Sequence, residues 1–259
     1  MPMYPRPRPS HFAALAGLVL AACNEPTTAA RGTPTDAGQT LSASTRAFEP
    51  ESDNPYFPLV PGTTFHYQSR TKEGLETEDF IVTTHTKVIS GVKPPVTALV
   101  VEDIVRLNGT IIEHTFDWFA QDAEPACPNC AHDVWYFGED SREFDPLTGE
   151  FIGTEGSWEA GRNGAQPGII MEGAPQVGDT YREEFAPGVA EDMARVLALD
   201  ARARVPYGSF SGCLKTENFT PLEPYAREEK YYCPGVGLVL EVSVTGGKER
   251  NELVSITPP

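Results

Sequence analysis

The chain has 259 residues, with 37 Asp and Glu against 20 Lys and Arg, which gives a formal charge of −17 at pH 7. An acidic surface repels phosphate backbones, so DNA and RNA are excluded as partners. The length allows a sizeable hydrophobic core.

The first 22 residues have the composition of an export signal. Arg6 and Arg8 precede an apolar run over residues 12–22, and no acidic residue occurs before position 25. The run is too short for a membrane-spanning helix, which needs about 20 apolar residues. Because the run also ends in small residues, we predict that residues 1–22 are a cleaved signal peptide.

The end of this run reads Leu20-Ala21-Ala22-Cys23, which resembles the lipobox of bacterial lipoprotein precursors. The resemblance implies cleavage before Cys23, lipidation of that cysteine, and anchoring of the protein to the lipid bilayer. The alternative is an ordinary signal peptide with a chance cysteine. Asn24 follows, and by the sorting rule of enteric bacteria this favours the outer membrane, facing the periplasm, over the inner membrane or cell surface.

Composition divides the remaining chain in two. Residues 23–55 are rich in Thr, Ala, Ser and Pro and have no hydrophobic periodicity, which is typical of a disordered, flexible tether. From Tyr56 onward, aromatic and β-branched residues recur between glycines and prolines. We therefore predict a lipidated cysteine and linker over residues 23–55, and a single β-rich domain over residues 56–259.

Alternating segments predict a series of strands in this domain. They cover residues 63–69, 80–89, 96–107, 110–120, 134–138, 180–185, 205–220, 228–233, 237–244 and 252–256. Asn108-Gly109 joins two of them and is a strong signal for a two-residue hairpin turn. Residues 190–199 have helix propensity, but their place in the repeat described next favours a strand.

Residues 56–140 and 175–245 resemble each other as an internal repeat. Gly62-Thr63-Thr64-Phe65 matches Gly178-Asp179-Thr180-Tyr181 at an offset of about 116 residues, and other short matches keep this spacing. Chance similarity between two β meanders is the alternative. The pattern predicts a mainly β fold, with antiparallel sheets from two similar meanders that form a sandwich or a curved half-barrel.

Two resemblances agree with this fold. The segments at residues 205–210 and 232–239 are similar to segments of bacterial envelope proteins that resemble lipoprotein-carrier half-barrels. The segments at residues 117–122 and 134–139 are similar to those of a group of bacterial lipoproteins with no assigned function. These resemblances imply a curved antiparallel sheet, and they do not imply any biochemical activity.

Four cysteines remain besides the predicted lipidation site: Cys127, Cys130, Cys213 and Cys233. Export places them in an oxidising compartment, so we favour the disulfides Cys127–Cys130 and Cys213–Cys233. A redox pair in Cys127-Pro128-Asn129-Cys130 and a soft-metal site completed by His132 and Asp133 are the alternatives. Covalent haem is excluded because Ala131 separates Cys130 from the histidine.

The chain lacks the motifs of common hydrolases, phosphate-binding loops and dinucleotide-binding folds. Asp117, Asp122, Glu139 and Asp140 lie beside aromatic residues, and a pair of such carboxylates is the arrangement that cleaves sugars. Nothing in the sequence fixes their separation. We therefore assign no catalytic residue, no metal ligand and no cofactor.

Aromatic residues supply the candidate ligand-binding site: Trp118, Trp135, Tyr136 and Trp158 fall within about 40 residues. The alternative is that these rings form the core. An aromatic cleft would support binding, whereas burial of all three tryptophans would remove it. The favoured function is a membrane-anchored, non-enzymatic envelope lipoprotein that binds an apolar small ligand or an envelope partner. A purely structural or interaction protein without a pocket, and an exported hydrolase with an unfamiliar carboxylate site, are the alternatives.

Overall fold

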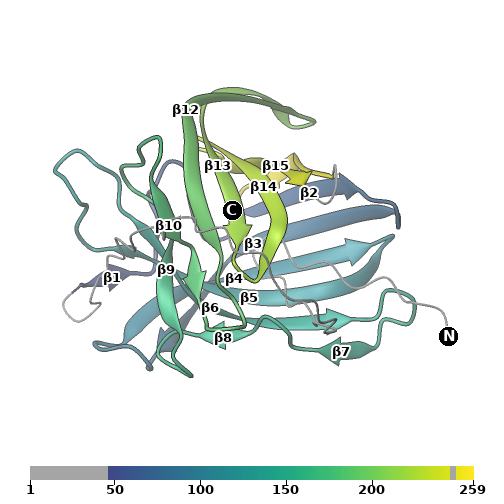
Figure 1. Cartoon of the computed structure of the whole chain (residues 1–259), viewed down its shortest axis with the longest axis horizontal. Helices are drawn as coiled ribbons and strands as arrows, with labels where there is room; N and C mark the ends of the chain where they lie inside the picture. Colours follow the sequence, from purple (N-terminus) through teal and green to yellow (C-terminus); the bar gives the residue numbers. More distant parts are fainter. Residues whose placement is uncertain (1–45, 246–248) are drawn as a thin grey trace, which may run out of the picture.

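The computed structural model describes residues 46–245 and 249–259, which form strands, turns and loops without a helix (Figure 1). Cys23, the predicted signal peptide and most of the predicted linker lie outside the described residues. In the described ranges, no helix has the length and apolar character to span a membrane.

Most of the sheet consists of two meanders of long strands. The first contains β2 (Thr64–Arg70), β3 (Leu75–Ile89), β4 (Val96–Leu107), β5 (Thr110–Asp122) and β6 (Val134–Phe144). The second contains β12 (Met193–Val205), β13 (Gly208–Thr220), β14 (Glu223–Cys233), β15 (Gly237–Thr245) and β16 (Arg250–Thr257). The short strands are β1 (Phe48–Glu49), β7 (Phe151–Gly153), β8 (Trp158–Glu159), β9 (Gln166–Met171), β10 (Thr180–Arg182) and β11 (Glu184–Phe185).

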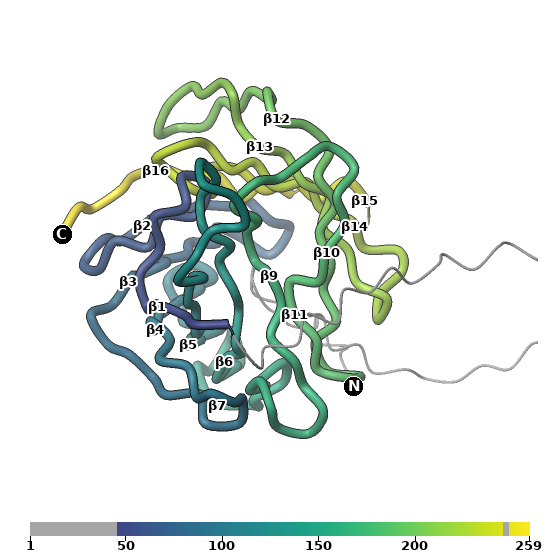
Figure 2. The backbone as a smooth tube through the Cα atoms, turned by 90° about the vertical axis from the view of Figure 1, so that its left-hand side faces the viewer, coloured from purple at the N-terminus to yellow at the C-terminus, as the bar shows by residue number. Residues whose placement is uncertain are grey.

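The two meanders join edge to edge into one sheet. Strand β16 pairs antiparallel with β2, and Leu253 lies opposite Tyr67. The strand order β10-β12-β13-β14-β15-β16-β2-β3-β4-β5-β6-β9-β11 then runs around a nearly closed barrel (Figure 2). The predicted fold class, mainly β with antiparallel meanders, is confirmed, and the sheet takes the curved form.

The segment at residues 180–185, which we call the closing strand, brings the two edges of the sheet together. Its first part, β10, pairs with β12 through Tyr181 opposite Ala194. Its last part, β11, pairs with β9 through Glu184 opposite Pro167. Glu183 lies between the two pairings. The prediction of a strand over residues 180–185 therefore holds except at this interruption.

Local sequence signals predicted the turn between β4 and β5 correctly. Asn108 and Gly109 have φ values of 51° and 89°, the positive values that a type I′ hairpin turn requires. Residues 190–199 fall largely within β12, so the strand interpretation was right and the helix propensity was overridden. The predicted strand over residues 205–220 is instead a hairpin, because a turn at Pro206 and Tyr207 separates β12 from β13.

Part of the predicted linker packs against the barrel. Phe48 on β1 contacts the ring of Trp135 edge-on, with 5.9 Å between centroids, and β1 pairs with β5. Farther along the predicted linker, Asn54 is completely buried, and its Nδ2 donates a hydrogen bond of 2.8 Å to the carbonyl oxygen of His132. The end of the predicted linker therefore packs on the barrel.

Both favoured disulfides are present. Cys127 and Cys130 are joined in the loop between β5 and β6, and Cys213 and Cys233 join β13 to the end of β14. The second pair is completely enclosed in the core. This pairing uses the cysteines that the redox and soft-metal alternatives would need.

Candidate interior site

The four predicted ligand-binding aromatics are core residues. Trp118 and Trp135 are each 5% exposed, Trp158 is 7% exposed and Tyr136 is 1% exposed. The structure brings Tyr136 and Trp158 into edge-on contact at 5.4 Å between ring centroids, while Trp118 lies beneath the ammonium of Lys87. Burial of all three tryptophans favours the core interpretation, since these rings line no open aromatic cleft.

The structure instead reveals a ring of buried polar side chains around the inner wall, which we call the acidic belt. It contains seven carboxylates, one lysine and two asparagines, and each is 7% exposed or less. The members are Glu78, Asp103, Asp117, Glu139, Glu183, Glu184, Asn218, Lys230, Glu241 and Asn251.

Strand register explains why these residues share one face of the sheet. Residues directly opposite each other in an antiparallel pair point to the same side. Asn251 lies opposite Glu241, and Glu241 lies opposite Lys230. In the first meander, Asp117 lies opposite Glu139. The belt residues therefore occupy inward-pointing positions, since side chains point alternately to the two faces of the sheet along strands of both meanders.

A tyrosine hydroxyl joins two belt carboxyls. The Tyr136 hydroxyl is 2.6 Å from Asp117 Oδ1 and 2.6 Å from Glu139 Oε2. A hydroxyl has a single proton to donate, so it can donate to one carboxylate while it accepts from the other carboxyl in its protonated form. Burial, with Glu113 and Glu78 nearby, raises the pKa of Asp117 to about 7. Burial and the charge of Asp117 also raise the pKa of Glu139.

The belt continues onto the closing strand through Glu184. The indole Nε1 of Trp158 donates a hydrogen bond of 2.7 Å to Glu184 Oε2. Burial raises the pKa of Glu184 well above its usual range, and the charges of Asp192 and Glu139 act in the same direction. Trp158 thus has a polar role that the prediction of an apolar cleft did not include.

On the second meander, hydrogen bonds connect the belt to the other side of the closing strand. Asn218 Nδ2 donates to Glu183 Oε2 at 2.7 Å, and the Thr216 hydroxyl donates to Asn218 Oδ1 at 2.6 Å. Burial raises the pKa of Glu183 to about 7, although Lys230 opposes the shift. The ammonium of Lys230 is 3.8 Å from Glu241 Oε2.

Several buried acceptors of this site have no hydrogen-bond partner among the described residues. Four of them are the carboxylate oxygens Asp117 Oδ2, Glu139 Oε1, Glu183 Oε1 and Glu184 Oε1. A fifth group, the Tyr232 hydroxyl on β14, has no partner either, and its residue is 1% exposed. Buried polar groups are normally paired, and an unpaired group costs about 1–3 kcal/mol. The belt therefore offers acceptors for hydrogen-bond donors.

The geometry gives little support to the metal site and the sugar-cleaving carboxylate pair that the sequence analysis considered. Among residues 46–245 and 249–259, no three His, Cys, Asp or Glu side chains are placed to hold a metal ion. Of the sugar-cleaving candidates, Asp117 and Glu139 come together, but they are enclosed in the barrel. Asp122 is held by Arg46, and Asp140 pairs with Arg142 at the surface.

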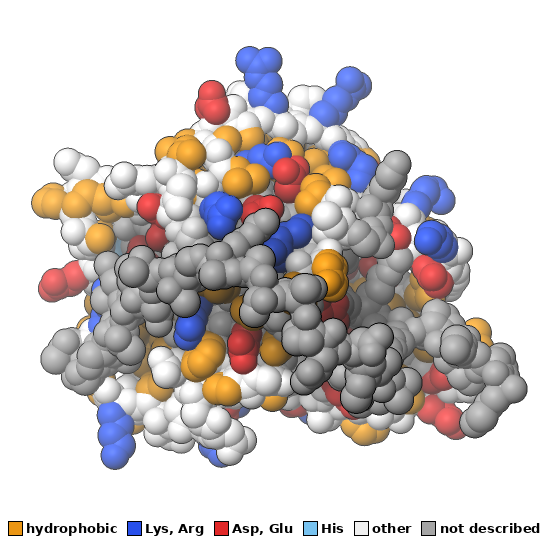
Figure 3. All heavy atoms as spheres, in the orientation of Figure 1, with side chains coloured by type: hydrophobic (Ala, Val, Ile, Leu, Met, Phe, Trp, Pro, Cys, Tyr) orange, Lys and Arg blue, Asp and Glu red, His pale blue; other side chains and the backbone are white. Residues whose placement is uncertain are grey.

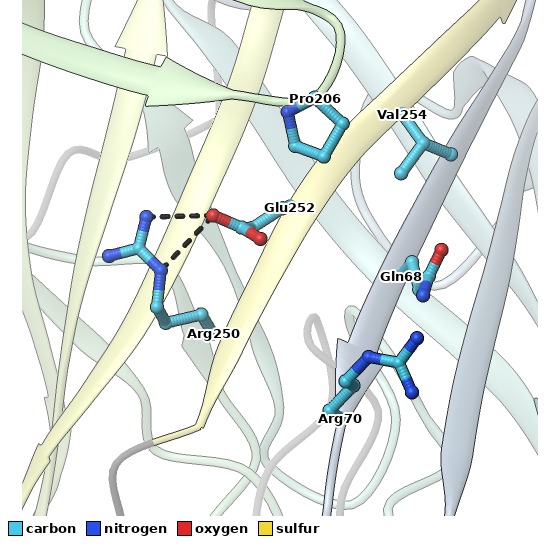
Figure 4. A pocket seen from close by; sticks show the side chains of 6 residues that line it. All are labelled: Gln68, Arg70, Pro206, Arg250, Glu252 and Val254. Carbon is cyan, nitrogen blue, oxygen red and sulfur yellow. Dashed lines mark hydrogen bonds and ion pairs between the residues drawn. The ribbon is translucent and has the colours of Figure 1, made fainter.

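The outer face carries a groove of about 450 Å³. It is lined by Gln68, Arg70, Pro206, Arg250, Glu252 and Val254 (Figure 4). Arg250 is engaged by Glu252, at 2.8 Å between Nη2 and Oε1. Basic, acidic and hydrophobic side chains are also interspersed over the face seen in Figure 3. The groove contains no buried polar group, so the interior is the more specific candidate.

No family model matches the chain, and no curated protein matches its sequence. Two solved structures are similar. A Bacteroides fragilis protein, inferred to be exported and described as having a YmcC-like fold, is 13% identical with a TM-score of 0.40, over 78% of this chain and 99% of that one. A Parabacteroides distasonis protein, inferred to be a lipoprotein, is 12% identical with a TM-score of 0.36, over 79% of this chain and 99% of that one. Neither likeness says what this chain binds.

Proposed function

We propose that this protein is a lipid-anchored protein of the bacterial cell envelope that binds a small ligand inside its barrel without catalysing a reaction. The acidic belt is the observation that carries the binding role. Four of its enclosed oxygens, one each on Asp117, Glu139, Glu183 and Glu184, and the Tyr232 hydroxyl are acceptors without a partner among the described residues. A ligand with N–H or O–H groups would supply the missing donors.

This proposal moves the binding site from the tryptophans to the inner wall. The apolar ligand expected from the sequence would suit the aromatic core, but the rings there already pack against one another. The belt instead suits a ligand with polar donors. Asp117 and Glu139, the two sugar-cleaving candidates that come together, both engage the Tyr136 hydroxyl in an enclosed position, which favours binding over catalysis.

The test is native mass spectrometry of the full-length protein extracted from its own membranes in detergent. We expect a bound small molecule that leaves on denaturation, and we expect Glu184→Gln to reduce its occupancy. Glu252→Gln, which changes a carboxylate on the outer face, is the matched control and should retain the ligand. A protein mass without any bound molecule in the wild type would favour the structural alternative.

Anchoring gives a separate prediction. Changing Cys23→Ser removes the thiol that the lipobox resemblance assigns to lipidation, so the protein should move from the membrane fraction to the soluble fraction. Acyl chains supply the attachment, because each buried methylene contributes about 0.8 kcal/mol. Fractionation followed by immunodetection measures the change. Membrane attachment that survives the substitution would show that this part of the proposal is wrong.

A further inference from the structure

We infer that the ligand of the acidic belt is a linear polyamine, held inside the barrel by hydrogen bonds from its protonated nitrogens to the belt carboxylates and the Tyr232 hydroxyl. This inference rests on the proposed function and adds the chemical class of the ligand.

The first argument is charge. The belt encloses the carboxyl groups of Asp117 and Glu139, which share the Tyr136 hydroxyl, and those of Glu183 and Glu184 on the closing strand. Like charges enclosed together are unfavourable, and the protein relieves this in part by sharing protons, as around the Tyr136 hydroxyl. A ligand with several positive charges would relieve the same repulsion, and it would also donate hydrogen bonds.

The second argument is the way the acceptors are distributed. A metal ion needs several ligand atoms around one point, and the described residues have no such group. The belt carboxylates are spread over successive strands, which lie about 4.8 Å apart. A chain of amines separated by short methylene segments can reach acceptors spaced in this way, whereas a single cation cannot.

The third argument is independent of the carboxylates. Tyr232 is buried, and its hydroxyl has no partner among the described residues. Tyr232 lies two residues after Lys230 on β14 and both side chains are buried, so Tyr232 points to the same inner face of the sheet as Lys230. A phenol oxygen accepts hydrogen bonds from N–H donors, so this hydroxyl provides a contact for an amine, and no hydrogen bond within the described fold uses it.

The belt already holds one ammonium group, that of Lys230, 3.8 Å from Glu241 Oε2. Lys230 shows that the belt accepts an ammonium. Burial alone would lower the pKa of Lys230, but Glu241 and Tyr232 help to hold it above its ordinary value.

The experiment is calorimetric titration of spermidine into the full-length protein in detergent at pH 7.5. We expect saturable binding, weakened about tenfold by Glu184→Gln and by Tyr232→Phe, since each removes one hydrogen bond to a charged group. Tyr232→Phe is the sharper variant. It deletes a hydroxyl without a partner, so the free protein should unfold at the same or a higher denaturant concentration while spermidine affinity falls. Glu252→Gln should leave the affinity unchanged.

Four results would overturn the inference, and the last two separate it from the proposed function. Saturable binding of Mg²⁺ that displaces spermidine would show that charge alone is recognised. Unchanged affinity in both Glu184→Gln and Tyr232→Phe would place spermidine outside the belt. If the extracted protein carries a bound molecule that spermidine does not displace, the amine class is wrong but the binding role stands. If no molecule is bound and spermidine gives no saturable heat, both proposals fail.

Discussion

Replacing Cys213 and Cys233 together by alanine is expected to lower the free energy of unfolding by about 3 kcal/mol. The disulfide spans a sequence separation of 20, and a loop of that size removes about this much conformational freedom from the unfolded chain in the entropy model. Both cysteines are fully buried. The bond also connects β13 to β14, the strands that carry Asn218 and Lys230, so its loss should loosen the belt.

Urea unfolding followed by circular dichroism measures this difference, and the second disulfide is the matched control. Cys127 and Cys130 are only three residues apart in a surface loop. The loop-entropy model predicts that the double variant Cys127→Ala with Cys130→Ala lowers the free energy of unfolding by about 1.5 kcal/mol. An equal decrease in the free energy of unfolding for the two double variants would contradict the expectation that the disulfide with the longer loop stabilises the barrel more.

Long strands rich in β-branched residues and bounded by turn signals were predictable from the sequence, and some short strands were not. Residues 96–107 match β4 in both bounds, because Val and Ile are frequent there and Asn108-Gly109 marks the turn. Strand β9 has six residues, including Pro167, which is too few to show a period, and it was not predicted, whereas β11 lies at the end of the predicted strand over residues 180–185. Their pairing closes the barrel, and it depends on contacts distant in sequence.

Two members of the acidic belt, Glu78 and Glu139, lay just outside the predicted strands, whereas others such as Asp103 lay within them but were not recognised as facing inward. Residues 80–89 were predicted as a strand, but β3 begins at Leu75 and includes Glu76 and Glu78, both buried. Similarly, β6 continues past the predicted end at residue 138 through Glu139. A carboxylate at an inward position breaks the hydrophobic alternation that defines a strand. Extending each strand in steps of two through acidic residues would have found the signal.

The stability of the protein should fall as the pH rises from 5.5 to 8.5. Asp117 has an ordinary pKa of 3.8 and a folded-state pKa of about 7, and Glu183 goes from 4.5 to about 7, mainly because both are buried. Between these values the folded protein binds more protons than the unfolded chain. A raised pKa therefore contributes stability that is present below the ordinary pKa and is lost as the pH passes the folded pKa.

Urea unfolding at several pH values between 5.5 and 8.5 measures this loss, which should be on the order of 3 kcal/mol for these groups together. Asp117→Asn keeps a side chain that can bond the Tyr136 hydroxyl but does not titrate, so its profile should be flatter than that of the wild type. Glu252→Gln on the outer face should leave the slope unchanged. A wild-type stability that does not fall toward pH 8.5 would mean that these carboxyls do not have raised pKa values in the folded protein, because a group with the same pKa in both states contributes no slope. The proton shared around Tyr136 would then be excluded as a source of stability.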